Sequence, residues 1–278
     1  MNRWIQAARP LTLPAAISPV LIAGSLLDSA LTNPVFYLIL LCAVLIQVNT
    51  NYVNDLCDFL KGADTEDRIG PKRTLASGLI KAGEIKVVII ILSLIILILG
   101  AYLVCLGGRA ILVIGLCSLL FSFLYTAGPY PLAYLGLGEV FVLIFFGPVA
   151  TWGTTWILAQ VNSIEAIYHG LASGMLSSAL LIVNNLRDYK TDKKANKNTL
   201  IVRFGQNFGK LEFSLFLTLA LLLAAHKEPL MLLLTPLTLL PIYKVFSFKD
   251  EKQLLPVLVQ VVILLTSYTI LFIVLRVK

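Results

Sequence analysis

The residues of this chain best suited to chemistry are carboxylates and carboxamides that recur at helical spacing. In the first group, Asn51 and Asp55 are four residues apart, and so are Asn54 and Asp58. Side chains four residues apart lie on the same face of a helix, so this spacing predicts one polar face that carries all four groups. Lys61 follows three residues later and would bring a cation to the same place.

A second group of the same kind lies about 130 residues further along the chain. Asn184, Asp188 and Asp192 again step by four residues, and Arg187 stands among them. Carboxylate and carboxamide oxygens are hard ligands suited to Mg²⁺, which is commonly bound through one or two carboxylates together with substrate phosphates. The two groups therefore predict a site that clamps a diphosphate through magnesium ions, which neutralise the leaving group.

Two other interpretations compete with a diphosphate site. Asp and Asn near helix ends often act as caps or as solvated turn residues. A proton or ion pathway would instead favour isolated carboxylates inside apolar runs, and Glu139 is the one candidate of that kind. Two similar groups in the same orientation favour the substrate site, because polar side chains at membrane depth are costly and usually functional.

The composition indicates that membrane-spanning helices position these groups. Of the 278 residues, 58% are hydrophobic and 13% are charged, whereas soluble domains usually carry about 25% charged residues. The hydrophobic residues form runs long enough to cross a bilayer as helices, which takes about 18 residues or more. We therefore expect an all-α polytopic membrane protein, with residues 1–278 forming a single transmembrane domain of nine spans. The expected spans are roughly 11–27, 35–54, 85–106, 109–126, 137–159, 164–186, 210–226, 229–247 and 254–276.

The lysine and arginine residues predict the orientation of these spans. Eighteen of the 22 fall on one side if the N-terminus is cytoplasmic, and cytoplasmic loops are enriched in these residues. This orientation puts both polar groups on the cytoplasmic side, in motif loops of about residues 55–84 and 187–209. Because the basic residues sit in loops between spans, the net charge of +7 does not indicate a nucleic-acid partner. The four cysteines have no metal-binding or redox spacing.

Four segments together resemble a known family of membrane enzymes. The chain resembles the UbiA-type intramembrane prenyltransferases, and most closely the MenA-like branch, the 1,4-dihydroxy-2-naphthoate polyprenyltransferases of menaquinone synthesis. The Asn-Asp-x-x-Asp pattern is typical of the whole superfamily, and the Gly-x-Asp-Thr and Gly-Pro-Tyr-Pro-Leu-Ala-Tyr segments are typical of the naphthoate branch. The segments that carry the likeness are Arg9 to Ala15, Asn51 to Thr65, Gly128 to Glu139 with Phe145 to Gly147 beyond it, and Asn184 to Leu200.

The resemblance implies a role for each polar residue of these segments. Similar enzymes have nine helices around a central cavity and bind Mg²⁺ and a polyprenyl diphosphate. The implied metal ligands are Asn54, Asp55, Asp58, Asp188 and Asp192. The residues implied to hold the diphosphate are Asn51, Lys61, Arg73 and Tyr125, and the implied catalytic set is Lys61, Asp58, Asp188 and Asp192. The residues expected at the acceptor are Arg9, which is similar to the family residue that meets the acceptor carboxylate, and Asn184 and Asn185.

The expected reaction follows from the same resemblance. The chain would transfer a polyprenyl group to an aromatic acid at the cell inner (plasma) membrane. The acceptor we expect is 1,4-dihydroxy-2-naphthoate, with loss of CO₂ to give demethylmenaquinone. Other acceptors of the superfamily stay open, namely 4-hydroxybenzoate, homogentisate, haem or a lipid headgroup, and a membrane transporter is a more distant alternative. Aromatic faces could stabilise an allylic cation, and the candidates are Phe145, Phe146, Trp152 and Trp156.

Overall fold

The described part of the chain is a bundle of helices. The computed structural model describes residues 2–28, 30–62, 69–70 and 73–276. These residues form twelve α-helices with short 3₁₀ turns and contain no strand. The helices are α1 (Arg3–Ala8), α2 (Leu13–Ser25), α3 (Pro34–Leu60), α4 (Ala82–Leu124), α5 (Gly138–Phe145), α6 (Pro148–Ala159), α7 (Ile164–Arg187), α8 (Tyr189–Lys194), α9 (Leu200–Phe204), α10 (Gln206–Lys227), α11 (Thr235–Ser247) and α12 (Leu255–Arg276).

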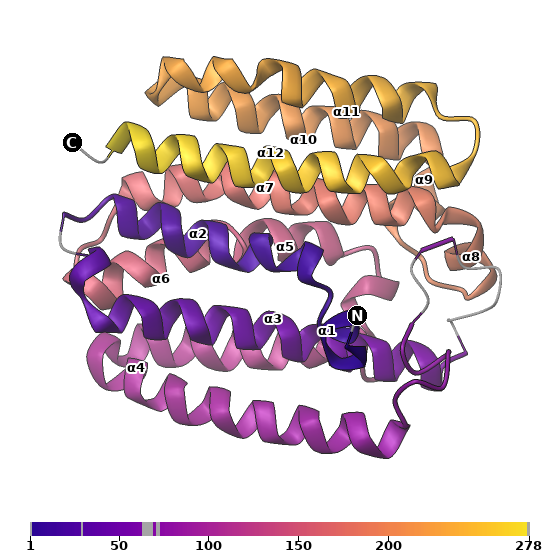
Figure 1. The fold of residues 1–278 in the computed structure, drawn as a ribbon, viewed down its shortest axis with the longest axis horizontal. Coiled ribbons are helices and arrows are strands. Elements are labelled where there is room, and N and C mark those ends of the chain that lie inside the picture. The colour runs from indigo at the N-terminus through magenta and orange to yellow at the C-terminus, as the bar shows by residue number, and fades with distance from the viewer. Residues whose placement is uncertain (1, 29, 63–68, 71–72, 277–278) are drawn as a thin grey trace.

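The long helices lie nearly parallel, and the short helices α8 and α9 lie together at one end of the bundle (Figure 1). Eight helical segments of the described chain are long and apolar enough to cross a membrane. The predicted all-α polytopic architecture is therefore confirmed. Most of the predicted spans match a single helical segment to within a few residues, and the segment from Gly138 to Ala159 is divided into α5 and α6.

Helix α4 is the reason that eight segments are found where nine spans were predicted. It runs for 43 residues, about 65 Å at the rise of an α-helix, which is twice the thickness of a hydrocarbon core of about 30 Å. At Gly108 the backbone leaves the helical region, with φ 68° and ψ −154°, a conformation open mainly to glycine. The two arms run out and back beside each other in Figure 1. The exact number of nine crossings stays a prediction.

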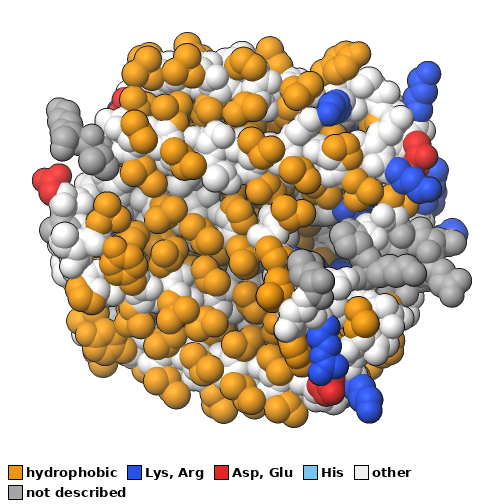
Figure 2. All heavy atoms as spheres, viewed as in Figure 1, with side chains coloured by type: hydrophobic (Ala, Val, Ile, Leu, Met, Phe, Trp, Pro, Cys, Tyr) orange, Lys and Arg blue, Asp and Glu red, His pale blue; other side chains and the backbone are white. Residues whose placement is uncertain are grey.

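The surface of the bundle is as expected for contact with lipid. Large apolar side chains such as Ile98 and Leu233 are 70% and 68% exposed. Figure 2 shows a face on which hydrophobic side chains cover the middle of the molecule, while lysine and arginine side chains gather towards one end. Polar side chains are buried instead, and many of them belong to the two predicted motifs. This reversal of the arrangement in soluble proteins supports the membrane assignment.

Helix α7 is the centre of the bundle, where it packs against α2, α5, α6, α10 and α12. Its glycines allow the chain break between α5 and α6 to come very close. A β-carbon added at Gly174 would collide with the carbonyl oxygen of Leu143, and one added at Gly170 would collide with the backbone at Gly147 and Pro148. Small residues allow this close backbone approach between membrane helices. The contact fixes α5 and α6 against α7, which carries the second motif.

The first prediction tests this contact. Gly174→Ala should lower the apparent Tm of the detergent-purified protein by several degrees, because overpacking a tight contact costs about 1–3 kcal/mol and the obstacle is backbone that cannot rotate away. The matched control is Gly83→Ala in the first turn of α4, where the added β-carbon meets no atom within 4 Å. It should leave Tm unchanged or raise it slightly. Equal Tm values for the two variants would contradict the close-approach argument.

Candidate active site

A single cavity of about 760 Å³ connects the two predicted motifs. It is lined by residues of α1 to α7 and of the segments between and after them, with a small contribution from α12. All the predicted site residues except Lys61 and Asp192 line it. The motif residues form its polar end, and the rest of its wall is mainly apolar. The cavity therefore offers one place for a charged group and another for a long hydrophobic group.

The first motif lies on the last three turns of α3, which continues to Leu60 as its spacing predicted. Asp55 is 1% exposed and accepts hydrogen bonds from Arg73 Nη1 at 3.2 Å and Thr74 Oγ1 at 2.6 Å. Its Oδ1 also lies 3.7 Å from Arg9 Nη2. Asp55 is thus held by cations and a hydroxyl from two other segments of the chain. These contacts indicate that it organises the positive side chains around the site.

Asp58 and Asn54 complete this face of α3. Arg73 Nη2 donates to Asp58 Oδ2 at 3.0 Å, so one guanidinium bridges both carboxylates of the motif. Asp58 Oδ1 is buried and has no hydrogen-bond partner among the described residues. Asn54 Oδ1 accepts from Thr126 Oγ1 at 2.7 Å. Residues 63–65 of the predicted first motif, which include Asp64, lie outside the described residues.

The second motif differs from its predicted form. The spacing predicted one continuous helical face, but α7 ends at Arg187 and α8 begins at Tyr189, so Asp188 lies at a bend. The Asp188 carbonyl accepts from the Thr191 hydroxyl at 2.9 Å and from the Asp192 amide at 2.8 Å. Arg187 is 3% exposed and donates two hydrogen bonds to Asp188, of 2.8 and 2.7 Å.

Asp192 follows on α8 and pairs with Lys197, whose Nζ donates to Oδ1 at 3.3 Å. Its other oxygen, Oδ2, is buried without a hydrogen-bond partner among the described residues. Burial raises the pKa of Asp192 to about 6, with Asp188 and Asp58 adding to the rise and Lys197 opposing it. Burial alone would lower the pKa of Lys197, but Asp192, Asp58 and Asp188 outweigh it and raise this pKa. Lys197 is therefore within electrostatic reach of both motifs.

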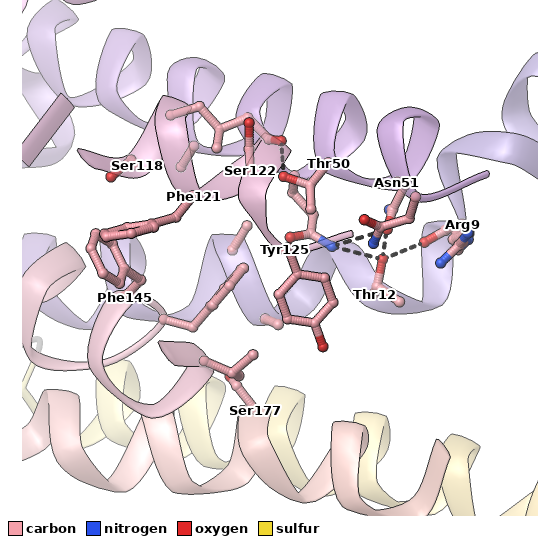
Figure 3. Close-up of a pocket in the computed structure, with 18 of the residues that line it drawn as sticks. Arg9, Thr12, Thr50, Asn51, Ser118, Phe121, Ser122, Tyr125, Phe145 and Ser177 are labelled. Atoms are coloured by element: carbon pink, nitrogen blue, oxygen red, sulfur yellow. Dashed lines mark hydrogen bonds between the residues drawn. The ribbon is translucent and has the colours of Figure 1, made fainter. Parts of the chain in front are cut away.

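Lys61 and Tyr125 were both predicted at the diphosphate. Lys61 Nζ donates to the Thr126 carbonyl at 2.6 Å and lies over the ring of Tyr134, so it borders the site without lining the cavity. Tyr125 follows α4 and points into the cavity (Figure 3). Burial raises the pKa of Tyr125 well above its usual range, and Glu139, Asp58 and Asp192 add to this effect. Its hydroxyl therefore stays protonated and available as a donor.

The entrance to α2 is held in an unusual conformation that places Arg9. Arg9 has a left-handed backbone with φ 50° between α1 and the following turn. Asn51 Nδ2 donates to the Ala8 carbonyl at 2.8 Å and to Thr12 Oγ1 at 3.0 Å, and Thr12 donates to the Arg9 carbonyl at 2.9 Å. Figure 3 shows Arg9, Thr12 and Asn51 joined in this way. Asn51 thus positions Arg9 through the backbone.

Asn184 and Asn185 do different things although they are neighbours. Asn184 Nδ2 donates to the carbonyl of Leu180 in its own helix. Asn185 Nδ2 donates to Glu139 Oε1 at 2.7 Å, which ties α7 to the start of α5. Glu139, the candidate for an ion pathway, is 2% exposed and is engaged in this structural contact. Both asparagines line the cavity, and a role at the acceptor stays a prediction.

Three phenylalanines form an aromatic cluster in which Phe121 lies edge-on to both Phe141 and Phe145, with ring centroids 4.6 and 5.3 Å apart. All three line the cavity, as does Phe146. The candidates Trp152 and Trp156 do not line it. They stack on each other and donate their indole N–H groups to Asn162 and to the Gly107 carbonyl.

The donor groups of the site fit a divalent cation that is shared with a phosphate ligand. Asp58 Oδ1 and Asp192 Oδ2, one from each motif, are buried carboxylate oxygens without partners in the described chain. Over residues 2–28, 30–62, 69–70 and 73–276, no three His, Cys, Asp or Glu side chains are grouped closely enough to hold a metal unaided. Mg²⁺ seldom uses such a closed protein cage and usually keeps waters and substrate phosphates as ligands.

The sequence interpretation assigned no site role to several residues that contact the motifs. Thr74 and Thr126 donate to Asp55 and Asn54, and Arg187 and Lys197 pair with Asp188 and Asp192. The two cations were visible as basic residues within the second motif segment. The two threonines gave no local signal, because each reaches its partner from a distant part of the chain. They are therefore findings of the structure.

A protein-family model matches nearly the whole of this chain. The UbiA prenyltransferase family matches residues 11–272, which include all the motif residues described above. The chain belongs to this family. The predicted membership is thereby confirmed, and the chain is a membrane-embedded prenyltransferase by family.

Several curated relatives are similar over most of their length. The 1,4-dihydroxy-2-naphthoate octaprenyltransferase of Haemophilus influenzae is 36% identical over 236 residues, which cover 80% of this chain and 75% of that protein. The enzyme of the same name from Mycobacterium tuberculosis is 35% identical over 265 residues, with 92% and 90% covered. The UbiA prenyltransferase domain-containing protein 1 of Danio rerio is 29% identical, with 79% and 66% covered.

Solved structures share the fold at low sequence identity. A UbiA homologue from Archaeoglobus fulgidus, bound to DMAPP and Mg²⁺, superposes with a TM-score of 0.66 at 17% identity and covers 98% of this chain and 99% of its own. The apo structure of a UbiA homologue from Aeropyrum pernix K1 gives a TM-score of 0.67 at 14% identity, with 98% and 99% covered. The family fold therefore extends over the whole described chain.

The second prediction concerns Lys197. Lys197→Met should lower kcat/KM for the prenyl diphosphate by about 100-fold or more, because it removes a cation from between the two motifs and leaves buried carboxylates without compensation. The KM for the aromatic acceptor should change little. Lys193→Met is the matched control, since Lys193 is an exposed lysine near the end of α8, four residues before Lys197. Equal kinetics for the two variants would show that Lys197 has no part in diphosphate binding.

Proposed function

We propose that this protein transfers a polyprenyl group from an isoprenyl diphosphate to 1,4-dihydroxy-2-naphthoate, with decarboxylation to demethylmenaquinone. The observation that carries the proposal is one cavity with two carboxylate motifs at its polar end and an apolar wall beyond them. The names of the curated bacterial relatives support the choice of acceptor. The polar end would hold the diphosphate, and the apolar part would hold the isoprenoid.

The chain's own cations would bind and orient the diphosphate. Arg73 bridges Asp55 and Asp58, and Lys197 pairs with Asp192 within electrostatic reach of Asp58, so both could contact an anion at the polar end while they stay anchored. The protonated Tyr125 hydroxyl would donate a further hydrogen bond from the cavity wall. Magnesium ions held by Asp58 and Asp192, with Asn54 and Asp188 beside them, would neutralise the charge that develops on the leaving diphosphate.

The reaction forms one bond and breaks two. The C–O bond to the diphosphate breaks and the diphosphate keeps the electron pair, which leaves an allylic cation. The ring carbon that bears the carboxylate attacks this cation, and the new C–C bond forms as CO₂ departs with its bonding electrons returned to the ring. Charge and atoms balance without an oxidant or reductant because the immediate product keeps both ring hydroxyls and is the quinol, the reduced form of demethylmenaquinone. The protein would contribute positioning, stabilisation of charge and a site that excludes water.

Two features of the cavity suit a short-lived cation. The cluster of Phe121, Phe141 and Phe145 offers aromatic faces and edges along the wall, and aromatic faces attract cations. The wall beyond the motifs is mainly apolar, so little water would be present to quench the cation. Arg9 would hold the carboxylate of the acceptor at the polar end, where its guanidinium already lies beside Asp55.

We further propose that the enzyme lies in the cell inner (plasma) membrane with its polar end in the cytoplasm. The positive-inside rule supports this orientation, because most lysine and arginine residues lie at the end that carries the motifs. The routes by which the two substrates would reach the site are consistent with this orientation. The polyprenyl chain would enter from the lipid, and the diphosphate and the aromatic acid would come from the cytoplasm.

A product assay tests the proposed function. Purified enzyme in nanodiscs, given polyprenyl diphosphate and Mg²⁺, should convert 1,4-dihydroxy-2-naphthoate to a product whose mass corresponds to prenyl addition and loss of CO₂. The panel would include 4-hydroxybenzoate, homogentisate, haem and a phospholipid. A product with one of these and none with the naphthoate would reassign the acceptor within the family. The absence of any prenylated product would favour the transporter alternative.

The third prediction concerns one carboxylate from each motif. Asp58→Asn and Asp192→Asn should each reduce kcat by more than about 1,000-fold with little change in Tm, because each keeps the side-chain volume and removes a charge that a divalent cation needs. Asp28→Asn, outside both motifs, is the matched control and should be active. If either motif variant kept more than about a tenth of wild-type turnover, its carboxylate would not be an essential ligand.

The fourth prediction separates acceptor binding at Arg9 from membrane anchoring. Arg9→Lys should raise KM for the aromatic acid and leave KM for the prenyl diphosphate nearly unchanged, since a lysine cannot reproduce the paired hydrogen bonds of a guanidinium to a carboxylate. A residue that only anchors the helix to the membrane surface would tolerate lysine. Wild-type kinetics for this variant would therefore remove Arg9 from the acceptor site.

The fifth prediction concerns orientation. In a cysteine-free background, Lys194→Cys at the motif end should resist a membrane-impermeant thiol reagent in intact cells and react after the membrane is permeabilised. Lys227→Cys, at the end of α10, should react in intact cells. Both positions are exposed in the structure, so a difference reports the side of the membrane. The opposite labelling pattern would invert the proposed topology.

A further inference from the structure

Gln47 is a buried polar residue that none of the proposed steps has used. It lies on α3 one turn before Asn51, is 8% exposed, and lines the cavity on the side of Arg9 and Thr12. Its Nε2 group donates to Thr12 Oγ1 at 3.2 Å and to Asn51 Oδ1 at 3.4 Å. A neutral amide at this depth is costly unless its hydrogen bonds are made.

The surrounding hydrogen bonds decide which way the amide of Gln47 faces. The Thr12 hydroxyl donates its one proton to the Arg9 carbonyl at 2.9 Å, so towards Gln47 it can only accept (Figure 3 shows the Thr12 contacts). Asn51 gives its own N–H groups to the Ala8 carbonyl and Thr12, so its Oδ1 also accepts. Gln47 must therefore present its NH₂ group to both partners.

This orientation leaves Gln47 Oε1 as an acceptor that nothing satisfies. The atom is buried and has no hydrogen-bond partner in the described part of the chain. A flip of the amide would not relieve it, because the flipped oxygen would then face two acceptors. A buried acceptor that is left unpaired costs more than a made hydrogen bond gains. A ligand in the cavity that carries a hydroxyl donor would remove this cost.

We propose that Gln47 Oε1 accepts a hydrogen bond from the ring hydroxyl of the acceptor that lies away from the carboxylate. This inference rests on the proposed function. The hydroxyl beside the carboxylate can close an internal hydrogen bond with it, whereas the remote hydroxyl has no such partner within the molecule. Thr12 contacts both the Arg9 backbone and Gln47, so an acid held by Arg9 can present its far side to Gln47. Gln47 would thus select a dihydroxy acid over a monohydroxy acid.

Gln47 would be a specificity-determining residue, and its selectivity has a physical basis. A site built around a substrate hydroxyl rejects the analogue without it, because the buried protein group is then left unpaired. The competing interpretation is that Gln47 only braces Thr12 and the strained backbone at Arg9. A brace would affect every acidic ligand to the same degree. The two interpretations therefore differ when two ligands are compared in one variant.

The experiment uses calorimetry to measure the Kd of two acids for the enzyme in nanodiscs. It also measures the turnover of the dihydroxy acid by the same enzyme. The acids are 1,4-dihydroxy-2-naphthoate and 1-hydroxy-2-naphthoate, which lacks the remote hydroxyl. The wild type should bind the dihydroxy acid about tenfold more tightly. Gln47→Leu should raise the Kd of the dihydroxy acid about tenfold and change the Kd of the monohydroxy acid by less than twofold. Gln47→Met, which is closer in shape, repeats the test if the leucine variant folds poorly. Arg9→Ala is the control and should raise the Kd of both acids to the same degree.

Each result bears on a different part of the argument. Loss of selectivity in the Gln47 variants supports the inference. If a folded Gln47 variant binds both acids more weakly to the same degree, Gln47 only braces Thr12 and Arg9, and the inference is wrong. The inference is also wrong if the wild type binds both acids equally. If the wild type turns over the dihydroxy acid in either case, the proposed function stands. If the wild type neither binds nor prenylates the dihydroxy acid, the proposed function fails, and this inference fails with it.

Discussion

The constraint on which the rest of the structure depends is the burial of carboxylates at the end of a membrane-spanning bundle. A buried carboxylate is stable only where cations or hydrogen-bond donors compensate its charge. Asp55 meets this condition through Arg73, Thr74 and Arg9, which come from two segments outside α3. The compensation therefore ties together the N-terminal segment, α3 and the chain before α4. The contacts that compensate the charge of the buried carboxylates therefore also shape the site.

The breaks between helices serve this constraint. Arg9 reaches Asp55 because the chain turns at a left-handed residue before α2. Asp188 lies at the bend between α7 and α8, which sends Asp192 back towards Lys197. At Gly147 the chain breaks between α5 and α6 and packs against the glycines of α7. The first motif needs no such break, because its residues line the cavity from the continuous helix α3.

The sequence was sufficient to predict what depends on local pattern. Hydrophobic runs predicted the spans, and spacing by four predicted the α3 face from Asn51 to Asp58, because both follow from the period of a helix. The bend at Asp188 was not predicted, because residues that step by four fit an uninterrupted helix equally well. Thr74, Thr126 and Gln47 were missed for a related reason. Their importance comes from partners on other segments, and spacing along the chain does not reveal such partners.

The charges of the site also explain why a cation should arrive with the substrate. In the described chain four motif carboxylates are in direct contact with four cations: Asp55 and Asp58 with Arg9 and Arg73, Asp188 with Arg187, and Asp192 with Lys197. The pairs are close to neutral as a set, so they have little positive charge to spare for a diphosphate. A diphosphate brings several negative charges into a site of low dielectric, where uncompensated charge is costly. Divalent cations would supply the missing positive charge, and Asp58 Oδ1 and Asp192 Oδ2 are buried oxygens that have no hydrogen-bond partner in the described chain and could bind them. Metal ions bound between the carboxylates and the substrate would therefore let these carboxylates serve in an anion-binding site.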